Sequence, residues 1–214
     1  LIEDAAQSFG ASYKNKKSCS FGDVAATSFF PAKPLGCYGD GGAIFTNNSK
    51  QAELYKSIRV HGQGKDKYDN IRIGLNSRLD TLQAAVLLNK LKIFNKELIL
   101  RENIAKFYSK NLSKYLTIPH VSELNQSSWA QYSLLANSIQ ERDRLINHLG
   151  TKGIPTAIYY KKIFSELNIY KNLNHRYFPN SKNSSDKIFS IPMYPYLSKV
   201  DLNKVISAIQ GFFK

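Results

Sequence analysis

The sequence has no continuous apolar run of about 18 residues, the length that a membrane-spanning helix needs. Its first residues contain neither the basic region nor the apolar segment of a secretory signal. It has only two cysteines, Cys19 and Cys37, which lack the CxxC spacing and the histidine partners of a zinc site. These absences predict a protein without a membrane span, a metal site or a disulfide framework, and the cytoplasm is its expected compartment.

Acidic residues are scarce, since 16 Asp and Glu stand against 30 Lys and Arg and give a formal net charge of +14. A charge of this size favours anionic partners. The basic residues are dispersed and form no recognisable nucleic-acid-binding module, so nucleic acid is not the expected partner. A nucleotide-diphosphate sugar is also strongly anionic and fits the same preference. The alternative is that an AT-rich genome raises the lysine content and that the charge has no functional meaning.

One lysine stands in an apolar stretch flanked by glycines, whereas most of the others stand in polar runs. Lys33 lies within Thr27-Ser-Phe-Phe-Pro-Ala-Lys-Pro-Leu-Gly36. These apolar neighbours would desolvate its amine and favour the neutral form, which attacks carbonyl groups. The alternative is a surface lysine whose stem lies along the loop.

A carboxylate, a small side chain and an amide follow one another near the N-terminus. Leu1-Ile-Glu-Asp-Ala-Ala-Gln7 is typical of a strand that ends at an acid, and strand geometry places Asp4 and Ala6 on one face. Asp4 would keep a pyridine nitrogen protonated, Ala6 would leave room for the ring, and Gln7 would reach its phenolic oxygen. Ser28 supplies a hydroxyl for a phosphate. Together with a Schiff-base lysine, these groups suit pyridoxal 5′-phosphate.

Several segments resemble, in order along the chain, the DegT/DnrJ/EryC1/StrS family of nucleotide-sugar aminotransferases. They are Glu3-Asp-Ala-Ala-Gln7, Ser28-Phe-Phe-Pro-Ala-Lys-Pro-Leu-Gly36, Gly39-Asp-Gly-Gly42, Arg59-Val-His-Gly62, Asn76-Ser-Arg-Leu-Asp-Thr-Leu-Gln-Ala-Ala85, Ile154-Pro-Thr-Ala-Ile-Tyr-Tyr160 and Ile191-Pro-Met-Tyr-Pro195. Within the family, the chain is similar to members that aminate a UDP-linked 3-oxo-glucuronate sugar.

The resemblance implies a pyridoxal-phosphate aminotransferase that moves an amino group, with glutamate as the expected donor, onto a keto group of a UDP-linked sugar. Such reactions serve the synthesis of bacterial cell-surface polysaccharides, including O antigen. Lys33 would hold the cofactor covalently and then move a proton as general acid and base. A lone histidine in a polar loop is more often solvated or structural, so His61 stays outside the predicted site.

The resemblance also implies a homodimer with shared sites, in which Asn76 reaches the cofactor phosphate of the partner subunit and Arg78 meets the sugar acid. A long helix is expected to begin at Asn76 or Ser77, where free amides favour an anion. The alternative for Asn76 is a helix cap. Tyr159 and Tyr160 stand where relatives often carry His-Tyr and are expected to contact the sugar, with core packing as the alternative.

The length and the 43% hydrophobic content suffice for one large or two small domains. The resemblance implies an α/β protein of fold type I, with part of a large domain and its mostly parallel sheet in residues 1–100 and a small α+β domain in residues 101–214. Patterns of apolar residues predict strands at 23–30, 41–46, 129–137 and 156–160, and helices at 50–60, 76–112, 140–149, 184–190 and 200–213.

The chain opens within an expected strand and without a methionine, so we expect it to be part of a longer protein. The resemblance implies an upstream phosphate-binding turn and a stacking aromatic, and this sequence contains neither, so the chain alone is expected to be inactive. Two other readings stay open. One is a sugar dehydratase of the same fold, in which histidine replaces Lys33. The other is a catalytically dead fragment that serves regulation or dimerisation.

Overall fold

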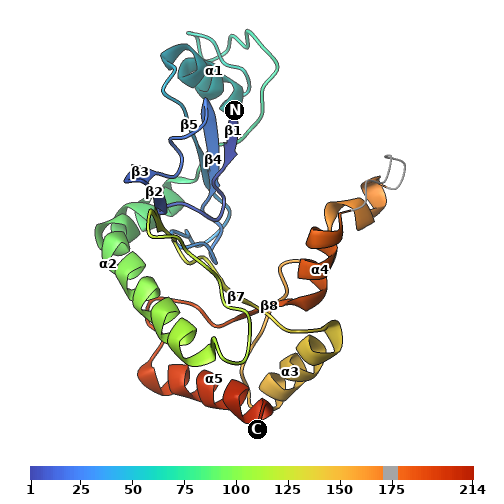
Figure 1. Cartoon of the computed structure of the whole chain (residues 1–214). Coiled ribbons are helices and arrows are strands. Elements are labelled where there is room, and N and C mark those ends of the chain that lie inside the picture. The colour runs from blue at the N-terminus through green and yellow to red at the C-terminus, as the bar shows by residue number, and fades with distance from the viewer. Residues whose placement is uncertain (171–177) are drawn as a thin grey trace. The chain divides into compact units, whose positions relative to one another are not determined.

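The computed structural model describes residues 1–170 and 178–214, which form two compact units (Figure 1). Unit 1 comprises Leu1–Ile99 and Val121–Ala130, and unit 2 comprises Leu100–His120 and Gln131–Lys214. The long helix α2 (Thr81–Leu112) contributes residues to both units. None of the helices in the described ranges combines the length and the apolar character that crossing a bilayer requires.

A three-stranded sheet forms the centre of unit 1, in the order β1 (Ile2–Asp4), β4 (Val24–Ser28) and β5 (Gly42–Phe45). β1 runs parallel to β4, whereas β4 and β5 are antiparallel. These three strands, which are part of the sheet expected to be mostly parallel, therefore form one parallel and one antiparallel pair. The reason is the loop at residues 29–41, which joins β4 to β5 without the crossover helix that a parallel pair needs.

The strand predicted at 23–30 exists but is shorter, at Val24–Ser28, and its side chains alternate between two environments. Ala25 and Thr27 are buried on one face of β4, whereas Ala26 is exposed and Ser28 half-buried on the other. Asp4 of β1 lies beside Ala26 in the parallel register and shares the open face. The strand thus directs a carboxylate and a hydroxyl to the same side of the sheet.

The buried face of this sheet and the loop after β4 share one hydrophobic core. Its buried members are Phe29, Leu35, Cys37, Leu87 and Phe94, of which the last two come from α2. The ring of the partly buried Phe9 packs edge-to-face on Phe29 at 6.0 Å. A second small sheet of β2 (Ser12–Tyr13), β3 (Lys16–Lys17) and β6 (Asn125–Gln126) completes the strands of this unit.

Helix α1 (Ser49–Arg59) begins where the sequence predicts, because the Asn48 Oδ1 accepts hydrogen bonds from the backbone amides of Lys50 and Gln51. The predicted start of α2 at Asn76 or Ser77 is wrong, since the helix begins at Thr81. Residues 75–77 instead pair with the end of α1, through a bridge between Val60 and Asn76 and a bond from Ser77 N to Arg59 O at 2.9 Å. This pairing holds residues 75–77 in an extended conformation, which a helical turn cannot share.

Unit 2 is built on an antiparallel pair of strands, β7 (Tyr132–Leu135) and β8 (Ile188–Ile191). The remaining elements are α3 (Ile139–Thr151), 3₁₀ turns η1 (Phe164–Glu166) and η2 (Asn168–Tyr170), α4 (Pro179–Lys187) and α5 (Lys199–Phe212). Helices α3 and α5 confirm the sequence predictions. Their buried faces, which include Leu145, Leu149, Val205 and Ile209, supply much of the core of this unit.

Two predicted elements of unit 2 are wrong. Residues 156–160 form no strand, because only Ala157 pairs, with Ser190, and Pro155 has no amide to extend a ladder. The helix predicted at 184–190 ends at Lys187 and gives way to β8, in which Phe189 is fully buried. The strand predicted at 129–137 exists but is shorter, at Tyr132–Leu135.

Candidate active site

Lys33 lies in the loop between β4 and β5, just beyond Ser28. Its backbone amide donates to the carbonyl of Phe30 at 2.9 Å, which closes a turn, and its side chain is half-buried. Only some of the apolar neighbours predicted to surround Lys33 are buried. The loop buries Phe29, Pro34 and Leu35 against the core, whereas Phe30 and Pro31 are exposed. The amine therefore stands at the border between the core and an open surface.

The segment after β1 brings Asp4 and Ala6 together, although by a route that differs from the prediction. The strand ends at Asp4, and the following residues form a turn in which Asp4 Oδ1 accepts a hydrogen bond from Ala6 N at 3.0 Å. Strand alternation therefore does not place Ala6. Gln7 has an exposed side chain, and its carbonyl accepts a hydrogen bond from the Ser128 hydroxyl at 2.9 Å.

Thr27 holds this turn on the sheet. Its buried hydroxyl donates to the carbonyl of Ala5 at 2.8 Å, and the Ala5 amide donates to Ala26 O at 2.8 Å. The Ser28 hydroxyl, one residue further on, accepts a hydrogen bond from Phe30 N at 3.2 Å. Asp4 and Ser28 thus lie on the same face of the sheet as Ala26, whose side chain is a single methyl group, and the turn that carries Lys33 follows Ser28 along the chain.

Glu3, next to Asp4, points to the other side of the strand. It accepts hydrogen bonds from Ser18 Oγ at 3.1 Å, Cys19 N at 2.7 Å and Phe21 N at 3.0 Å. Partial burial raises the pKa of this carboxyl, but the hydrogen bonds together outweigh that effect and the net pKa is lowered. Sequence reasoning missed Glu3 and Thr27 as supports of the site, although both lie inside or beside the quoted motifs.

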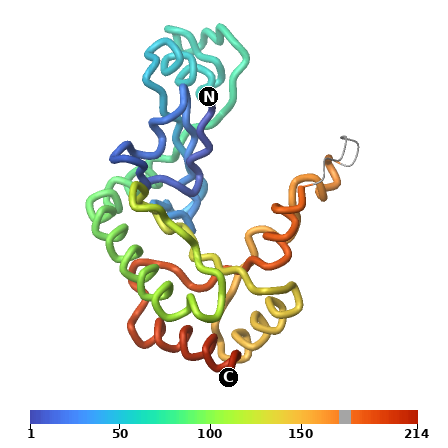
Figure 2. Tube along the Cα trace, viewed as in Figure 1, coloured from blue at the N-terminus to red at the C-terminus, as the bar shows by residue number. Residues whose placement is uncertain are grey.

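A second group of polar residues lies where the loop at residues 61–78 folds back beside α1, as Figure 2 traces. His61 N donates to Leu75 O at 2.9 Å, and Leu75 N donates to Ile58 O at 2.7 Å. Gly62 and Gly74 make this approach possible. A Cβ on Gly62 would lie 1.8 Å from Arg72 O, and one on Gly74 would lie 2.0 Å from Gly62 N.

The loop encloses a pocket of about 410 Å³, lined by Val60, His61, Gln63, Lys67, Tyr68, Asn70 and Arg78. Arg78 and Lys67 are cations and none of the lining residues is acidic, so the pocket suits an anionic group. Arg78 Nε donates to the Asn76 Oδ1 at 3.0 Å. Because α2 begins at Thr81, Asn76 does not lie at a helix start, and the predicted anion site at free helix amides is wrong for this residue.

His61 lines this pocket together with Arg78, although the sequence analysis placed it outside the site. The sequence signal was present in Arg59-Val-His-Gly62, whose glycine allows the tight crossing. In the described part of the chain, no hydrogen bond or ion pair joins Asn76 or Arg78 to Lys33. The structure therefore presents two separate polar groups in unit 1.

The two tyrosines of unit 2 are surface residues. Tyr159 is 40% exposed and Tyr160 64% exposed, with their rings edge-to-face at 5.6 Å, so the core alternative is wrong. No group of three or more metal-ligating side chains occurs within residues 1–170 and 178–214.

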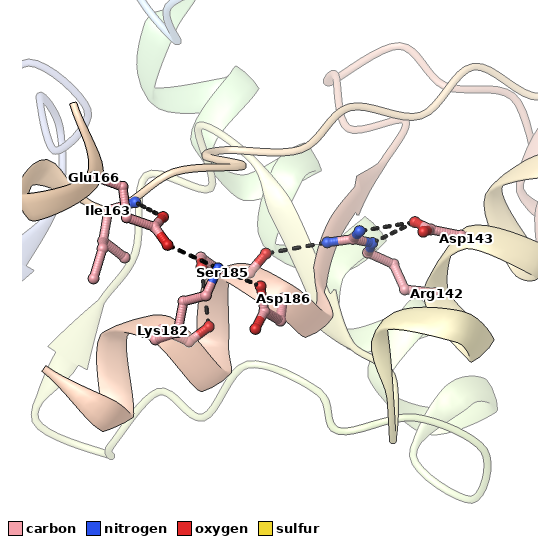
Figure 3. A network of polar contacts seen from close by, with 7 residues as sticks. All are labelled: Arg142, Asp143, Ile163, Glu166, Lys182, Ser185 and Asp186. Carbon is pink, nitrogen blue, oxygen red and sulfur yellow. Dashed lines mark hydrogen bonds and ion pairs between the residues drawn. The ribbon is translucent and has the colours of Figure 1, made fainter. Parts of the chain in front are cut away.

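A polar network ties the segment after these tyrosines to α4 (Figure 3). Lys182 forms ion pairs with Glu166 at 2.9 Å and with Asp186 at 3.0 Å. Arg142, nearly buried on α3, pairs with Asp143 at 2.8 Å and donates to Ser185 O at 3.1 Å. The network thus anchors η1 and α3 to α4 within unit 2.

Residues 1–210 match the DegT/DnrJ/EryC1/StrS aminotransferase family. The chain belongs to this family. It is 43% identical over 210 residues to a UDP-2-acetamido-2-deoxy-3-oxo-D-glucuronate aminotransferase of Pseudomonas aeruginosa, which covers 98% of this chain and 57% of that protein. It is 34% identical to a "Pleiotropic regulatory protein" of Geobacillus stearothermophilus, over 100% of this chain and 58% of that protein.

Among solved structures, a DegT DnrJ EryC1 StrS aminotransferase from Brucella abortus is similar, with a TM-score of 0.94 and 47% identity. The match covers 99% of this chain and 56% of that one. The chain therefore has the α/β fold of the fold-type-I aminotransferases and spans little more than half the length of these relatives.

Proposed function

We propose that the protein is a pyridoxal-phosphate-dependent aminotransferase that transfers an amino group, with glutamate as donor, to a keto group of a UDP-linked sugar. The reaction would take place in the cytoplasm and serve a cell-surface polysaccharide such as O antigen. Membership of the family and the similarity to the Pseudomonas aeruginosa enzyme support this function. The observation that carries it is that Asp4 and Ser28 share the open face of the sheet with Ala26, while the half-buried Lys33 stands in the loop directly after Ser28.

The groups on this face fit the cofactor chemically. Asp4 offers a carboxylate for a protonated ring nitrogen, Ser28 a hydroxyl for a phosphate oxygen, and Lys33 an amine for a carbonyl carbon. Ala6 is small enough to leave room for the ring, and Gln7 has an exposed amide for the phenolic oxygen. Pyridoxal phosphate, when bound, supplies the electron sink that transamination needs.

The chain's own residues then have distinct tasks. Lys33 would provide the amine that holds the cofactor, and the same amine would serve as general acid and base that moves a proton at the donor carbon. Asp4 keeps the ring nitrogen charged, because an anion favours the protonated form of a base beside it. Its orientation is fixed by the amide of Ala6 and by the anchoring of the turn through Thr27.

The basic pocket would take the anionic part of the substrate. Arg78 and Lys67 provide the charge and His61 a polar wall, which suits a sugar acid or a diphosphate. Asn76 would reach the cofactor phosphate of a partner subunit, so that the active protein is a homodimer with shared sites. Tyr159 and Tyr160 are exposed and would contact the sugar.

The test uses the intact protein, the Lys33→Ala variant and the matched control Lys17→Ala, which removes an exposed lysine in β3. Lys33→Ala should lose amino transfer to a UDP-linked keto sugar by several orders of magnitude while its circular dichroism stays unchanged. It should also lose the visible absorbance that borohydride abolishes in the parent. Near-normal turnover of Lys33→Ala would exclude the proposal.

A second function, as a regulatory module, is suggested by the name of the Geobacillus stearothermophilus relative, a pleiotropic regulatory protein. It predicts neither the visible absorbance nor amino transfer in the parent protein, so the same experiment separates the two functions. The dehydratase alternative is disfavoured because Lys33 stands where those enzymes have histidine.

A further inference from the structure

The loop at residues 29–41, which carries Lys33, rests on one face of helix α2. Gln83, Leu87, Lys90 and Phe94 follow one another at spacings of four, three and four residues, so they share one side of the helix. Leu87 and Phe94 pack in the core cluster beneath the loop. The two polar residues of this face reach the loop backbone instead.

Lys90 and Gln83 each bond one backbone group of the loop. Lys90 Nζ donates to the carbonyl of Gly36 at 2.6 Å, and the Gln83 Oε1 accepts a hydrogen bond from Tyr38 N at 2.7 Å. Gly36 is buried, whereas Tyr38 is exposed, so Lys90 serves a group that water reaches poorly. Neither residue has a role in the chemistry proposed above.

Two glycines of the loop allow its backbone to approach Gln83 and Cys37 closely. A Cβ on Gly39 would lie 3.1 Å from Gln83 Nε2, and one on Gly41 would lie 3.0 Å from the Cys37 Sγ. The loop therefore closes tightly both on Gln83 and on itself. The two motifs Gly39-Asp-Gly-Gly42 and Leu82-Gln-Ala-Ala85 meet at this contact.

We propose that Gln83 and Lys90 are positioning residues that fix the loop and thereby hold Lys33 in place for the reaction. Loops are ordinarily among the least stable parts of a fold, and a displacement of about 1 Å at a reacting group can cost on the order of a hundredfold in rate. The expected effect on turnover rests on the proposed function. The stabilisation of the loop by Gln83 and Lys90 is independent of that function, so it can be measured without cofactor or substrate.

Cys37 provides that measurement, because its thiol lies inside the loop. The side chain is fully buried, and its Sγ lies 3.0 Å from both Phe29 O and Gly39 O, either of which can accept its single proton. Alkylation by iodoacetamide therefore requires the loop to open. Cys19, which is partly exposed, serves as an internal reference in the same molecule when the two peptides are quantified by mass spectrometry.

The variants are Lys90→Met and Gln83→Met, with Lys92→Met as the control. Lys92 lies on the same helix but is exposed and donates only to the Asn89 Oδ1, at 2.9 Å. Lys90→Met should speed Cys37 alkylation about tenfold, the change that loss of a charge-assisted hydrogen bond gives. Gln83→Met should speed it about threefold, because water can replace Gln83 at the exposed Tyr38. Lys92→Met should react like the parent.

The faster alkylation should also be seen in urea below the unfolding transition, and its rate should hardly change with the urea concentration. Such independence from urea is typical of a local opening, which exposes little new surface. Lys90→Arg, which keeps a charged donor, should restore most of the protection. Amino transfer by Lys90→Met should fall in kcat with little change in KM for the amino donor. Parent-like alkylation in both Met variants, or an acceleration that follows global unfolding, would overturn the proposal. If the intact parent protein showed no amino transfer, the proposed function would be refuted, but the alkylation result would still decide whether Gln83 and Lys90 hold the loop.

Discussion

Replacing Gly36 by alanine tests how tightly the Lys33 turn is closed. A Cβ at this position would lie 2.5 Å from Pro31 O and 2.7 Å from Phe30 O, whereas ordinary contact begins at 3.4 Å. Both obstacles are backbone atoms, so no side-chain rotation relieves them. The carbonyl of Phe30 must move, although it accepts the hydrogen bond from Lys33 N that closes the turn.

The cost can be estimated from overpacking. Forcing a methyl group into a packed site costs about 1–3 kcal/mol, and the gain from removing a flexible glycine is at most about 1 kcal/mol. Gly36→Ala should therefore lower the free energy of unfolding by about 1–2 kcal/mol. The matched control is Gly211→Ala in α5, where a Cβ meets nothing within 4 Å and where alanine should stabilise the helix by up to about 1 kcal/mol.

Urea unfolding of the two variants and the parent gives these differences, and alkylation of Cys37 shows whether the change is local. Gly36→Ala should expose Cys37 as well as destabilise the protein. If Gly36→Ala were as stable as the parent and kept Cys37 protected, the turn would have room for a side chain. The tight closure inferred around Lys33 would then be wrong.

Two further predictions concern the assembly and the pH dependence. Mixing inactive Lys33→Ala subunits with inactive subunits that carry both Asn76→Ala and Arg78→Ala should restore part of the activity, since one site of a hybrid dimer keeps every native residue; exchange of subunits without any activity would rule out shared sites. The lowered pKa of Glu3 means that its contribution to stability is fully present above its ordinary value of 4.5 and is lost as the pH falls through the lowered value. Glu3→Gln should therefore flatten the loss of stability in acid urea titrations, and an unchanged slope would contradict a stabilising role for this carboxylate.

Short-range signals in the sequence predicted the elements that carry Lys33 and its partners. The β-branched and aromatic run at 23–30 gave β4 with Ser28 at its end, and Asn48 gave the start of α1. Each depends on a few adjacent residues. The motifs predict that Asp4, Ser28 and Lys33 belong to one site. Asp4 and Ser28 share one face of the sheet, and Lys33 stands in the loop that follows Ser28.

Long-range pairing decided what the sequence could not predict. The apolar spacing of Leu79 and Leu82 extends the helical pattern toward Asn76, but the end of α1 pairs with this segment and delays the helix to Thr81. The same pairing forms the pocket that holds His61 and Arg78. His61 and Arg78, which line this pocket together, stand 17 positions apart in the sequence, so the motif around His61 indicates a tight turn but not the residue across the pocket.

Neighbouring acids show how the fold separates support from chemistry. Glu3 and Asp4 adjoin in the sequence, but strand alternation sends them to opposite faces. Both oxygens of Glu3 accept hydrogen bonds from the segment at residues 18–21, so this carboxylate is committed to the fold. Asp4 accepts only the amide of Ala6 among the described residues, which leaves its second oxygen for a ligand.

The same division holds along the Lys33 loop. Its Gly36 carbonyl, Cys37 thiol and Tyr38 amide all have protein partners, whereas the Lys33 amine donates to no acceptor in the described ranges. The Ser28 hydroxyl accepts from Phe30 N and keeps its own proton to donate. The groups proposed to meet the cofactor are thus those that the fold holds in place but leaves unused, which is what a preorganised site requires.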